Sequence, residues 1–189
     1  GRRDAHAAPG RCCGPGGRAR RSPGTGRGHR HPAGRARIDD SKRLTPLQRE
    51  IAFPEIVAKS IFGLGVINEN LIDSLNILVA TRLAMEEAIA ELIVKLECTL
   101  KDKVKILIDG DVKLNIDYPF TNIIKGDTKS KSIACASILA KVIRDKMMSA
   151  YHKAYPQYGF LAHKGYGPSL HQQALKSFGP SLIHRLTFL

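Results

Sequence analysis

The stretch from residue 125 to residue 145 brings cations, hydroxyls and carboxylates into a short part of the chain. It begins Lys125-Gly-Asp-Thr-Lys-Ser and ends at Asp145, and the sequence His-Lys-Gly-Tyr-Gly follows at 163–167. Ammonium and hydroxyl groups suit phosphate oxygens. A carboxylate beside an anionic substrate is costly unless a metal ion lies between them. The combination favours a nuclease that uses divalent metal on a nucleic-acid backbone.

Asp109 is a candidate metal ligand because it follows a short apolar run, 104–108, of the strand type. In α/β proteins, ligands bind at the carboxyl ends of such strands. A carboxylate there is braced by a rigid element and suits a hard cation. Asp109 with Gly110 is also a common turn after any strand, so both interpretations stay open.

Asp145 is a weaker candidate when taken alone, because it lies late on a helix expected to end near residue 154. Lys141 precedes it by four residues, which is also the spacing of an ordinary surface ion pair. The start of the same helix offers hydroxyls and free backbone N–H groups, a known anion-binding arrangement. Asp111, Asp117 and Asp127 are weaker still, since all three are expected in polar loops.

Helices and strands alternate along the segments that would position these residues. A helix should begin with Thr45 as N-cap and Pro46 in its first turn, with a kink or interruption at Pro54. The other expected elements are a strand at 61–67, a turn or cap at 68–70, a helix from 71 to about 100 with a possible early break, strands at 104–108 and 122–124, a helix capped by Ser130 or Ser132 that runs to about 154, and a last helix at 169–177. Such alternation is typical of an α/β layered domain.

Positive charge is concentrated near the N-terminus. Residues 1–37 contain ten Arg, nine Gly, four Pro and one acidic residue, but no Val, Ile, Leu, Met, Phe or Tyr. Such a segment cannot offset its ordering entropy by burying apolar surface, so we predict that it is disordered. Residues 38–189 have the composition of one mildly basic globular domain, which is compatible with nucleic-acid binding.

Other sequence features argue against a membrane or a zinc site. The four Cys show no zinc-type spacing, no apolar stretch is long enough to span a bilayer, and no signal peptide is visible. These features predict a cytoplasmic protein without a membrane partner.

The order and spacing of several motifs resemble bacterial ribonuclease HII, the type 2 ribonuclease H class. The resemblance runs from Asp39 to Phe188. It is carried by Asp40-Ser-Lys-Arg-Leu, Leu75-Asn-Ile-Leu, Ile108-Asp-Gly, Lys125-Gly-Asp, Ser132-Ile-Ala-Cys-Ala-Ser continuing to Asp145, Tyr155-Pro-Gln-Tyr-Gly-Phe, His163-Lys-Gly-Tyr-Gly and His184-Arg.

The resemblance implies a ribonuclease H-like fold, with a mixed sheet flanked by helices and with further C-terminal helices. It implies a monomeric endonuclease that cleaves the RNA strand of RNA–DNA hybrids, including at single ribonucleotides in duplex DNA, and leaves 5′ phosphates. Mg²⁺ or Mn²⁺ would be held by four acidic residues, and two such ions can activate water and stabilise the leaving oxygen. Selecting RNA also requires that the 2′-OH is read.

The resemblance also assigns roles to individual residues. Asp109 and Asp145 match the third and fourth acids, and Tyr166 matches the residue that senses the ribonucleotide junction. The remaining substrate contacts implied in this way are Ser41, Lys42, Lys141 and Lys164.

The family's first two acids lie in a Gly-x-Asp-Glu-Ala-Gly-Arg-Gly-Pro motif on its first strand, and residues 1–37 contain no such motif. We therefore expect 38–189 to be an N-terminally incomplete catalytic domain that lacks the first strands. Either residues 1–37 come from a shifted reading frame, or the chain is an inactive relative that binds hybrids without cutting them. Both explanations predict little activity for the chain as written. A basic RNA-associated protein without a site is a third alternative, and it predicts salt-sensitive binding without preference for ribonucleotides.

Overall fold

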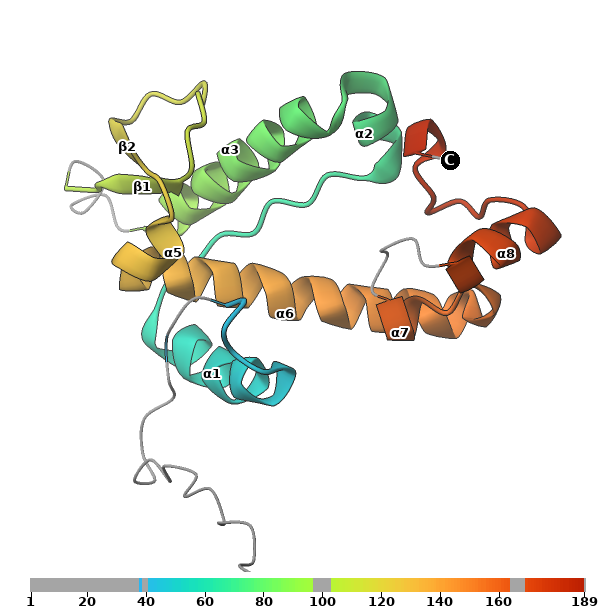
Figure 1. The fold of residues 1–189 in the computed structure, drawn as a ribbon. Coiled ribbons are helices and arrows are strands. Elements are labelled where there is room, and N and C mark those ends of the chain that lie inside the picture. Colours follow the sequence, from blue (N-terminus) through green and yellow to red (C-terminus); the bar gives the residue numbers. More distant parts are fainter. Residues whose placement is uncertain (1–37, 39–40, 97–102, 164–168, 189) are drawn as a thin grey trace, which may run out of the picture. The chain divides into compact units, whose positions relative to one another are not determined.

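The computed structural model describes residues 38, 41–96, 103–163 and 169–188 (Figure 1). The predicted disorder of residues 1–37 therefore lies outside the described residues, as do Lys164 and Tyr166. The elements in chain order are α1 (Pro46–Lys59), α2 (Glu69–Leu75), α3 (Ile77–Lys95), β1 (Ile106–Asp109), β2 (Phe120–Ile123), α5 (Gly126–Lys129), α6 (Lys131–Ala154), η1 (Pro156–Tyr158), α7 (Phe160–His163), α8 (Ser169–Phe178) and η2 (Leu186–Phe188).

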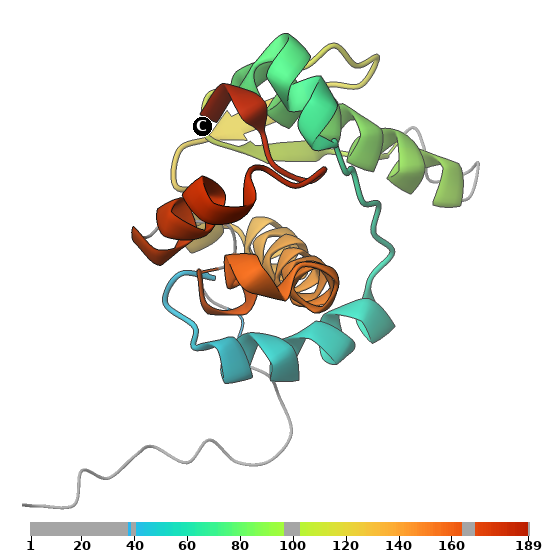
Figure 2. The ribbon, with the colours of Figure 1, turned by 90° about the vertical axis from the view of Figure 1, so that its right-hand side faces the viewer.

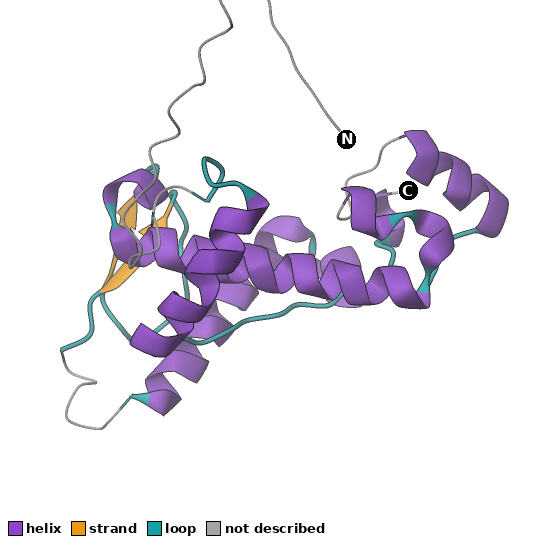
Figure 3. Cartoon of the chain, turned by 90° about the horizontal axis from the view of Figure 1, so that it is seen from below, coloured by secondary structure: helices purple, strands orange, loops and turns teal. Residues whose placement is uncertain are grey.

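The predicted α/β class is confirmed, with helices in the majority and a small parallel sheet (Figure 3). Strands β1 and β2 pair in register, Ile106 opposite Phe120 and Asp109 opposite Ile123. No third strand pairs with them within the described residues. Because the two strands are parallel, their carboxyl ends share one edge, and Asp109 lies at that edge. None of the described helices is both long and apolar enough to cross a membrane.

Helix α1 begins as the sequence predicted, but the interruption predicted at Pro54 is wrong. Thr45 and Gln48 form a reciprocal capping box, with Pro46 next to the cap. The helix runs through Pro54 to Lys59. Its buried face packs on α6, which stabilises the helix on both sides of the proline. That core contains Leu44, Ala52, Ile56, Ile138, Leu139 and Val142. Figure 2 shows α1 lying beside α6.

The strand predicted at 61–67 is wrong, and this segment instead lies extended along α3. We call residues 61–67 the strap. The backbone N–H groups of Leu64 and Val66 donate to the carboxylates of Glu91 and Glu87 on α3. A Cβ added at Gly65 would lie 1.8 Å from the Ala84 carbonyl oxygen. The strap is therefore extended like a strand, but its hydrogen-bond partners are helix side chains.

Helices α2, α3, α6 and α8 lie where helices were predicted, although α3 ends at Lys95 and Ser130 precedes α6 without a side-chain capping bond. Asn68 caps α2, and Asn76 accepts hydrogen bonds from the first turn of α3, which gives the expected early break between these helices. Asp73 of α2 accepts hydrogen bonds from the backbone N–H groups of Leu186 and Thr187, at 2.7 and 3.0 Å. This carboxylate therefore holds the start of η2 although more than a hundred residues separate the partners.

The end of α6 and the elements after it enclose a cluster of aromatic and histidine rings. Tyr158 is buried at its centre, and its hydroxyl donates to the Gly179 carbonyl at 2.7 Å. The rings of His171 and His184 stack with their centroids 5.2 Å apart. Ring packing of this kind fixes η1, α7 and α8 against one another.

Candidate active site

Asp109 ends β1 with its side chain exposed, and it is held by the backbone of the next loop. One carboxylate oxygen, Oδ1, accepts a hydrogen bond from the Gly126 N–H at 2.7 Å. A Cβ added at Gly126 would lie 2.5 Å from Cδ1 of Ile133 and 3.3 Å from Oδ1 of Asp109. A side chain at this position would therefore crowd both the end of the Ile133 side chain and the candidate metal ligand.

The two neighbours of Gly126 are also unusual. Lys125 adopts the left-handed conformation, with φ 55°, which is uncommon for a residue other than glycine. Asp127 is only 9% exposed, although its side chain ends in a carboxyl group. No described residue donates a hydrogen bond to its carboxylate or forms an ion pair with it. A buried carboxylate is costly unless it is paired or binds a metal, so Asp127 is a candidate ligand beside Asp109.

The sequence ranked Asp127 low because a polar loop was expected around it, and burial cannot be read from a loop. The available signal was its place in Lys125-Gly-Asp, one of the strings that carry the family resemblance. In the structure, Asp109 accepts a hydrogen bond from the residue that immediately precedes Asp127. The backbone of Asp127 therefore directly follows the N–H group that holds the Asp109 carboxylate.

Asp145 and Lys141 form an ion pair on α6, with Nζ and Oδ1 2.8 Å apart. Both side chains are partly buried, and the spacing is i,i+4, as the more ordinary interpretation of the sequence expected. The ion pair gives Asp145 a local partner, and it ties the predicted substrate cation Lys141 to that carboxylate.

A divalent metal would be compatible with the carboxylates present. Oxygen ligands suit Mg²⁺ and Mn²⁺, and Mg²⁺ commonly takes one or two carboxylates and completes its shell with water or phosphate oxygens. Asp109 and Asp127 could supply that minimal set. Among the described residues, no three or more His, Cys, Asp and Glu side chains form a group able to hold a metal ion.

Ser41 and Lys42 lie in a turn that precedes α1 and contacts α6. The Ser41 hydroxyl hydrogen-bonds that of Ser137 at 2.7 Å, one helical turn before Lys141. Ser41 is buried, whereas Lys42 is exposed. The hydrogen bond thus joins the turn that contains Ser41 and Lys42, two predicted substrate contacts, to the helix that carries Lys141. The predicted contacts Lys164 and Tyr166 lie outside the described residues.

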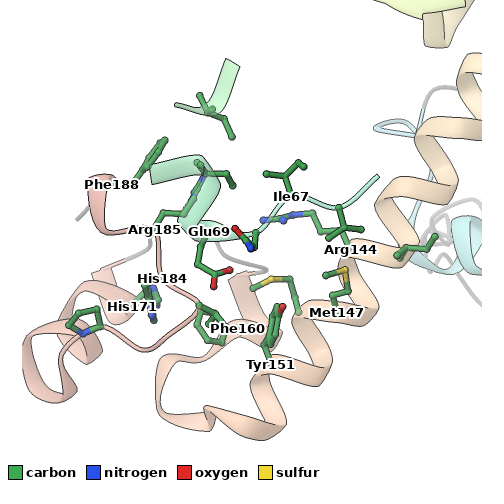
Figure 4. Close-up of a pocket in the computed structure, with 18 of the residues that line it drawn as sticks. Ile67, Glu69, Arg144, Met147, Tyr151, Phe160, His171, His184, Arg185 and Phe188 are labelled. Carbon is green, nitrogen blue, oxygen red and sulfur yellow. The ribbon is translucent and has the colours of Figure 1, made fainter. Parts of the chain in front are cut away.

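A cavity of about 1040 Å³ is lined by the strap, α2, α6, α8 and the C-terminal segment. Figure 4 shows Arg144 and Arg185 among apolar and aromatic side chains, with Glu69 as the labelled acid. None of the predicted site residues lines this cavity. Carboxylates and backbone contacts, rather than cavity size, therefore identify the candidate site.

Comparison with known proteins gives a consistent assignment. The family model for ribonuclease HII matches residues 33–189. The ribonuclease HII of Ruminiclostridium cellulolyticum is 49% identical over 153 residues, which cover 80% of this chain and 57% of that relative. The ribonuclease HII of Geotalea daltonii is 44% identical over 156 residues, which cover 82% of this chain and 69% of that relative.

The Geobacter sulfurreducens ribonuclease HII is 44% identical over 152 residues, or 67% of its length. The chain thus spans between about half and two thirds of the curated relatives that it matches. The matched region contains Asp109, the Lys-Gly-Asp loop and the whole of α6. With a family model that covers most of its length and relatives at this level of identity, the chain belongs to the ribonuclease HII family.

Proposed function

We propose that the protein is a metal-dependent endonuclease that hydrolyses the RNA strand of RNA–DNA hybrids, including at single ribonucleotides within duplex DNA. The observation that carries the proposal is the hydrogen bond from the Gly126 N–H to the exposed Asp109 carboxylate, in a loop whose next residue is the buried Asp127. Membership of the ribonuclease HII family supports it. A ribonuclease H-like mixed sheet belongs to the same proposal.

Asp109 and Asp127 would hold Mn²⁺ or Mg²⁺. When bound, the metal would supply Lewis acidity toward a phosphate oxygen and lower the pKa of a bound water. The family resemblance assigns a metal-binding role to Asp145, while its ion pair with Lys141 favours a role in orienting that cation. We propose both roles, metal ligand and partner of Lys141, and the Asp145→Asn variant described below distinguishes them.

The substrate contacts proposed on the described residues are Ser41, Lys42 and Lys141. The ammonium groups would bind phosphate oxygens, which position the duplex without reading its sequence. Lys164 would add a further cation, and Tyr166 would stack on the sugar at the ribonucleotide junction. The proposed partner is thus an RNA–DNA hybrid or a ribonucleotide-containing duplex, bound by a monomer.

A second candidate is a relative that binds hybrids without cutting them. The absence of a group of three or more metal-ligating side chains among the described residues favours it. It shares the cationic contacts of the first candidate and differs only in chemistry.

The experiment that separates the two uses the purified 189-residue chain and a labelled duplex with one embedded ribonucleotide. The measurements are cleavage with Mg²⁺ or Mn²⁺, hybrid binding in EDTA, and Mn²⁺ affinity by electron paramagnetic resonance. We expect weak cleavage that leaves 5′ phosphates. Asp109→Asn and Asp127→Asn should each weaken Mn²⁺ binding about tenfold or more while hybrid binding persists.

The Asp145→Asn variant separates the two proposed roles of that residue. A metal ligand would lower Mn²⁺ affinity as Asp109 does, whereas a partner of Lys141 would alter hybrid binding alone. Binding of the hybrid with no cleavage in either metal would favour the non-cutting relative. Failure to bind hybrids in preference to plain DNA duplexes would contradict both candidates.

A further inference from the structure

The turn before α1 has buried ends and an exposed tip. We call residues 41–44 the cationic turn. Ser41 and Leu44, at its ends, are 7% and 3% exposed. Lys42 and Arg43, between them, are both exposed. The backbone therefore projects two consecutive cations outward from a base that is fixed in the core.

Arg49, on α1, holds the two ends of the cationic turn together from the buried side. It is 9% exposed, and its Nη1 donates to the carbonyl oxygens of Ser41 and Leu44 at 2.7 and 2.6 Å. A single nitrogen thus bridges two carbonyls three residues apart. A guanidinium stays protonated at any ordinary pH, and burying it is tolerable only when its donors are satisfied. These two hydrogen bonds explain how the charged Arg49 side chain can lie on the core-facing side of α1.

A second tether joins the cationic turn to α6. The Ser41 and Ser137 hydroxyls are 2.7 Å apart. Because Ser137 precedes Lys141 by one helical turn, the contact relates the base of the cationic turn to the part of α6 that carries Lys141. Two directional contacts, from α1 and from α6, therefore act on one four-residue turn.

We propose that Arg49 is a positioning residue for substrate, which closes the cationic turn so that Lys42 is presented to a backbone phosphate of the bound duplex. The inference rests on the proposed function, because it requires that Lys42 contacts the hybrid. It goes beyond that function by assigning the geometry of Lys42 to a buried side chain that does not itself touch the substrate. Pre-setting the turn lowers the ordering cost of binding.

The test is a double-mutant cycle with Arg49→Met and Lys42→Ala in the full chain. Binding of a fluorescent RNA–DNA hybrid is measured in EDTA at several salt concentrations. We expect Lys42→Ala to weaken binding about fivefold and to reduce the slope of log affinity against log salt by about 0.9, the effect of one lost phosphate contact. Arg49→Met should do nearly the same. In the Lys42→Ala background, Arg49→Met should cost less than about twofold, since it acts through a group already removed.

Two further variants separate positioning from a general effect on stability. Ile93→Val shortens a buried side chain of α3, outside the core cluster that contains Leu44 of the cationic turn, so it should lower the melting temperature and leave hybrid binding unchanged. Arg49→Lys retains the charge and should recover part of the affinity. If Arg49→Met does not fold, Ser137→Ala removes the other tether and should show the same non-additivity with Lys42→Ala.

The outcomes distinguish this inference from the function on which it rests. Additive losses for Arg49→Met and Lys42→Ala would overturn the positioning role and leave Lys42 as a substrate contact. Full binding by Lys42→Ala would contradict the proposed role of Lys42, and the inference would fall with it.

Discussion

At the scale of single residues, the candidate site depends on how closely the backbone can approach a carboxylate. Gly126 donates to Asp109, and a Cβ added at Gly126 would meet Cδ1 of Ile133 and press on Oδ1 of Asp109. Lys125 is held in a left-handed conformation just before it. Such strain persists where the surrounding structure requires it, and it is concentrated at functional sites.

Gly126→Ala should therefore have two separable effects. The added Cβ meets Ile133 Cδ1, which should destabilise the fold by about 1–3 kcal/mol, and it also presses on Asp109 Oδ1, which should lower Mn²⁺ affinity about tenfold. Thermal denaturation and Mn²⁺ titration measure the two effects. In the double variant with Ile133→Val the Cδ1 atom is gone, so stability should recover while Mn²⁺ affinity stays low. Recovery of both would mean that Gly126 matters for packing alone.

At the scale of elements, the packing of the strap on α3 depends on two glycines. A Cβ at Gly63 would lie 2.0 Å from the Ala88 carbonyl oxygen, and one at Gly65 would lie 1.8 Å from that of Ala84. Ala84 and Ala88 are one helical turn apart, as are the Glu87 and Glu91 carboxylates that accept from the strap. The contacts between the strap and α3 therefore recur every two residues of the strap and every four residues of the helix.

Gly65→Ala should separate the strap from α3, because the atom it meets is helix backbone that cannot turn aside. We expect a loss of about 1–3 kcal/mol in the free energy of unfolding, measured by urea denaturation. Faster hydrogen exchange at Leu64 and Val66 should accompany it. Ile61→Ala, at an exposed position of the same segment, serves as the control and should change stability by about 0.5 kcal/mol or less. Equal effects of the two variants would contradict a packing requirement at Gly65.

At the scale of the whole molecule, several contacts between residues distant in sequence weaken in acid. Burial lowers the pKa of His184 below its ordinary value of 6.5, and the neighbouring His171 adds to this. The Thr187 hydroxyl, aided by backbone N–H groups, lowers the pKa of Asp73, and Lys95 followed by the Leu64 N–H lowers that of Glu91. For each group the unfolded chain takes up its proton at a higher pH than the folded chain does.

Stability should consequently fall in two steps as the pH decreases. The His184 contribution is intact above pH 6.5 and is lost as the pH falls through the folded pKa. The Asp73 and Glu91 contributions are intact above their ordinary values of 3.8 and 4.5 and are lost below them. Melting temperatures between pH 8 and pH 3 would show both steps. His184→Asn keeps an acceptor for Ser181 and should remove only the first step, and a curve without that step in the unmodified chain would contradict the assignment.

Local signals in the sequence predicted the elements that depend on their own residues. Thr45, Asn68 and the i,i+4 pair of Lys141 and Asp145 all behave as their spacing indicated. The strap was mistaken for a strand because its β-branched residues and glycines suit any extended backbone, and its partners are glutamates some twenty residues away.

The candidate site was predicted only in part, because local signals do not reveal partners that are distant in sequence. Asp109 ends a strand that is recognisable from its apolar run, so its exposure could be anticipated. The burial of Arg49 could not, because it depends on backbone carbonyls of the preceding turn, and the polar sequence around Asp127 gave no sign that this residue is buried. A cation on a helix is ordinarily assigned to solvent, and here its hydrogen-bond acceptors lie in the turn five to eight residues before it.

The strap shows how an extended backbone can follow a helix. Two extended residues advance roughly 6.6 Å, whereas four helical residues advance roughly 6.0 Å, so each repeat adds a shift of about 0.6 Å between the partners. Three contacts keep this spacing, because Phe62 accepts from Lys95 while Leu64 and Val66 donate to Glu91 and Glu87. The accumulated shift of about 1.2 Å is small enough for long, flexible lysine and glutamate side chains to absorb. An extended segment can thus follow the long axis of a helix through side-chain hydrogen bonds, and this one ends at Asn68, where α2 begins.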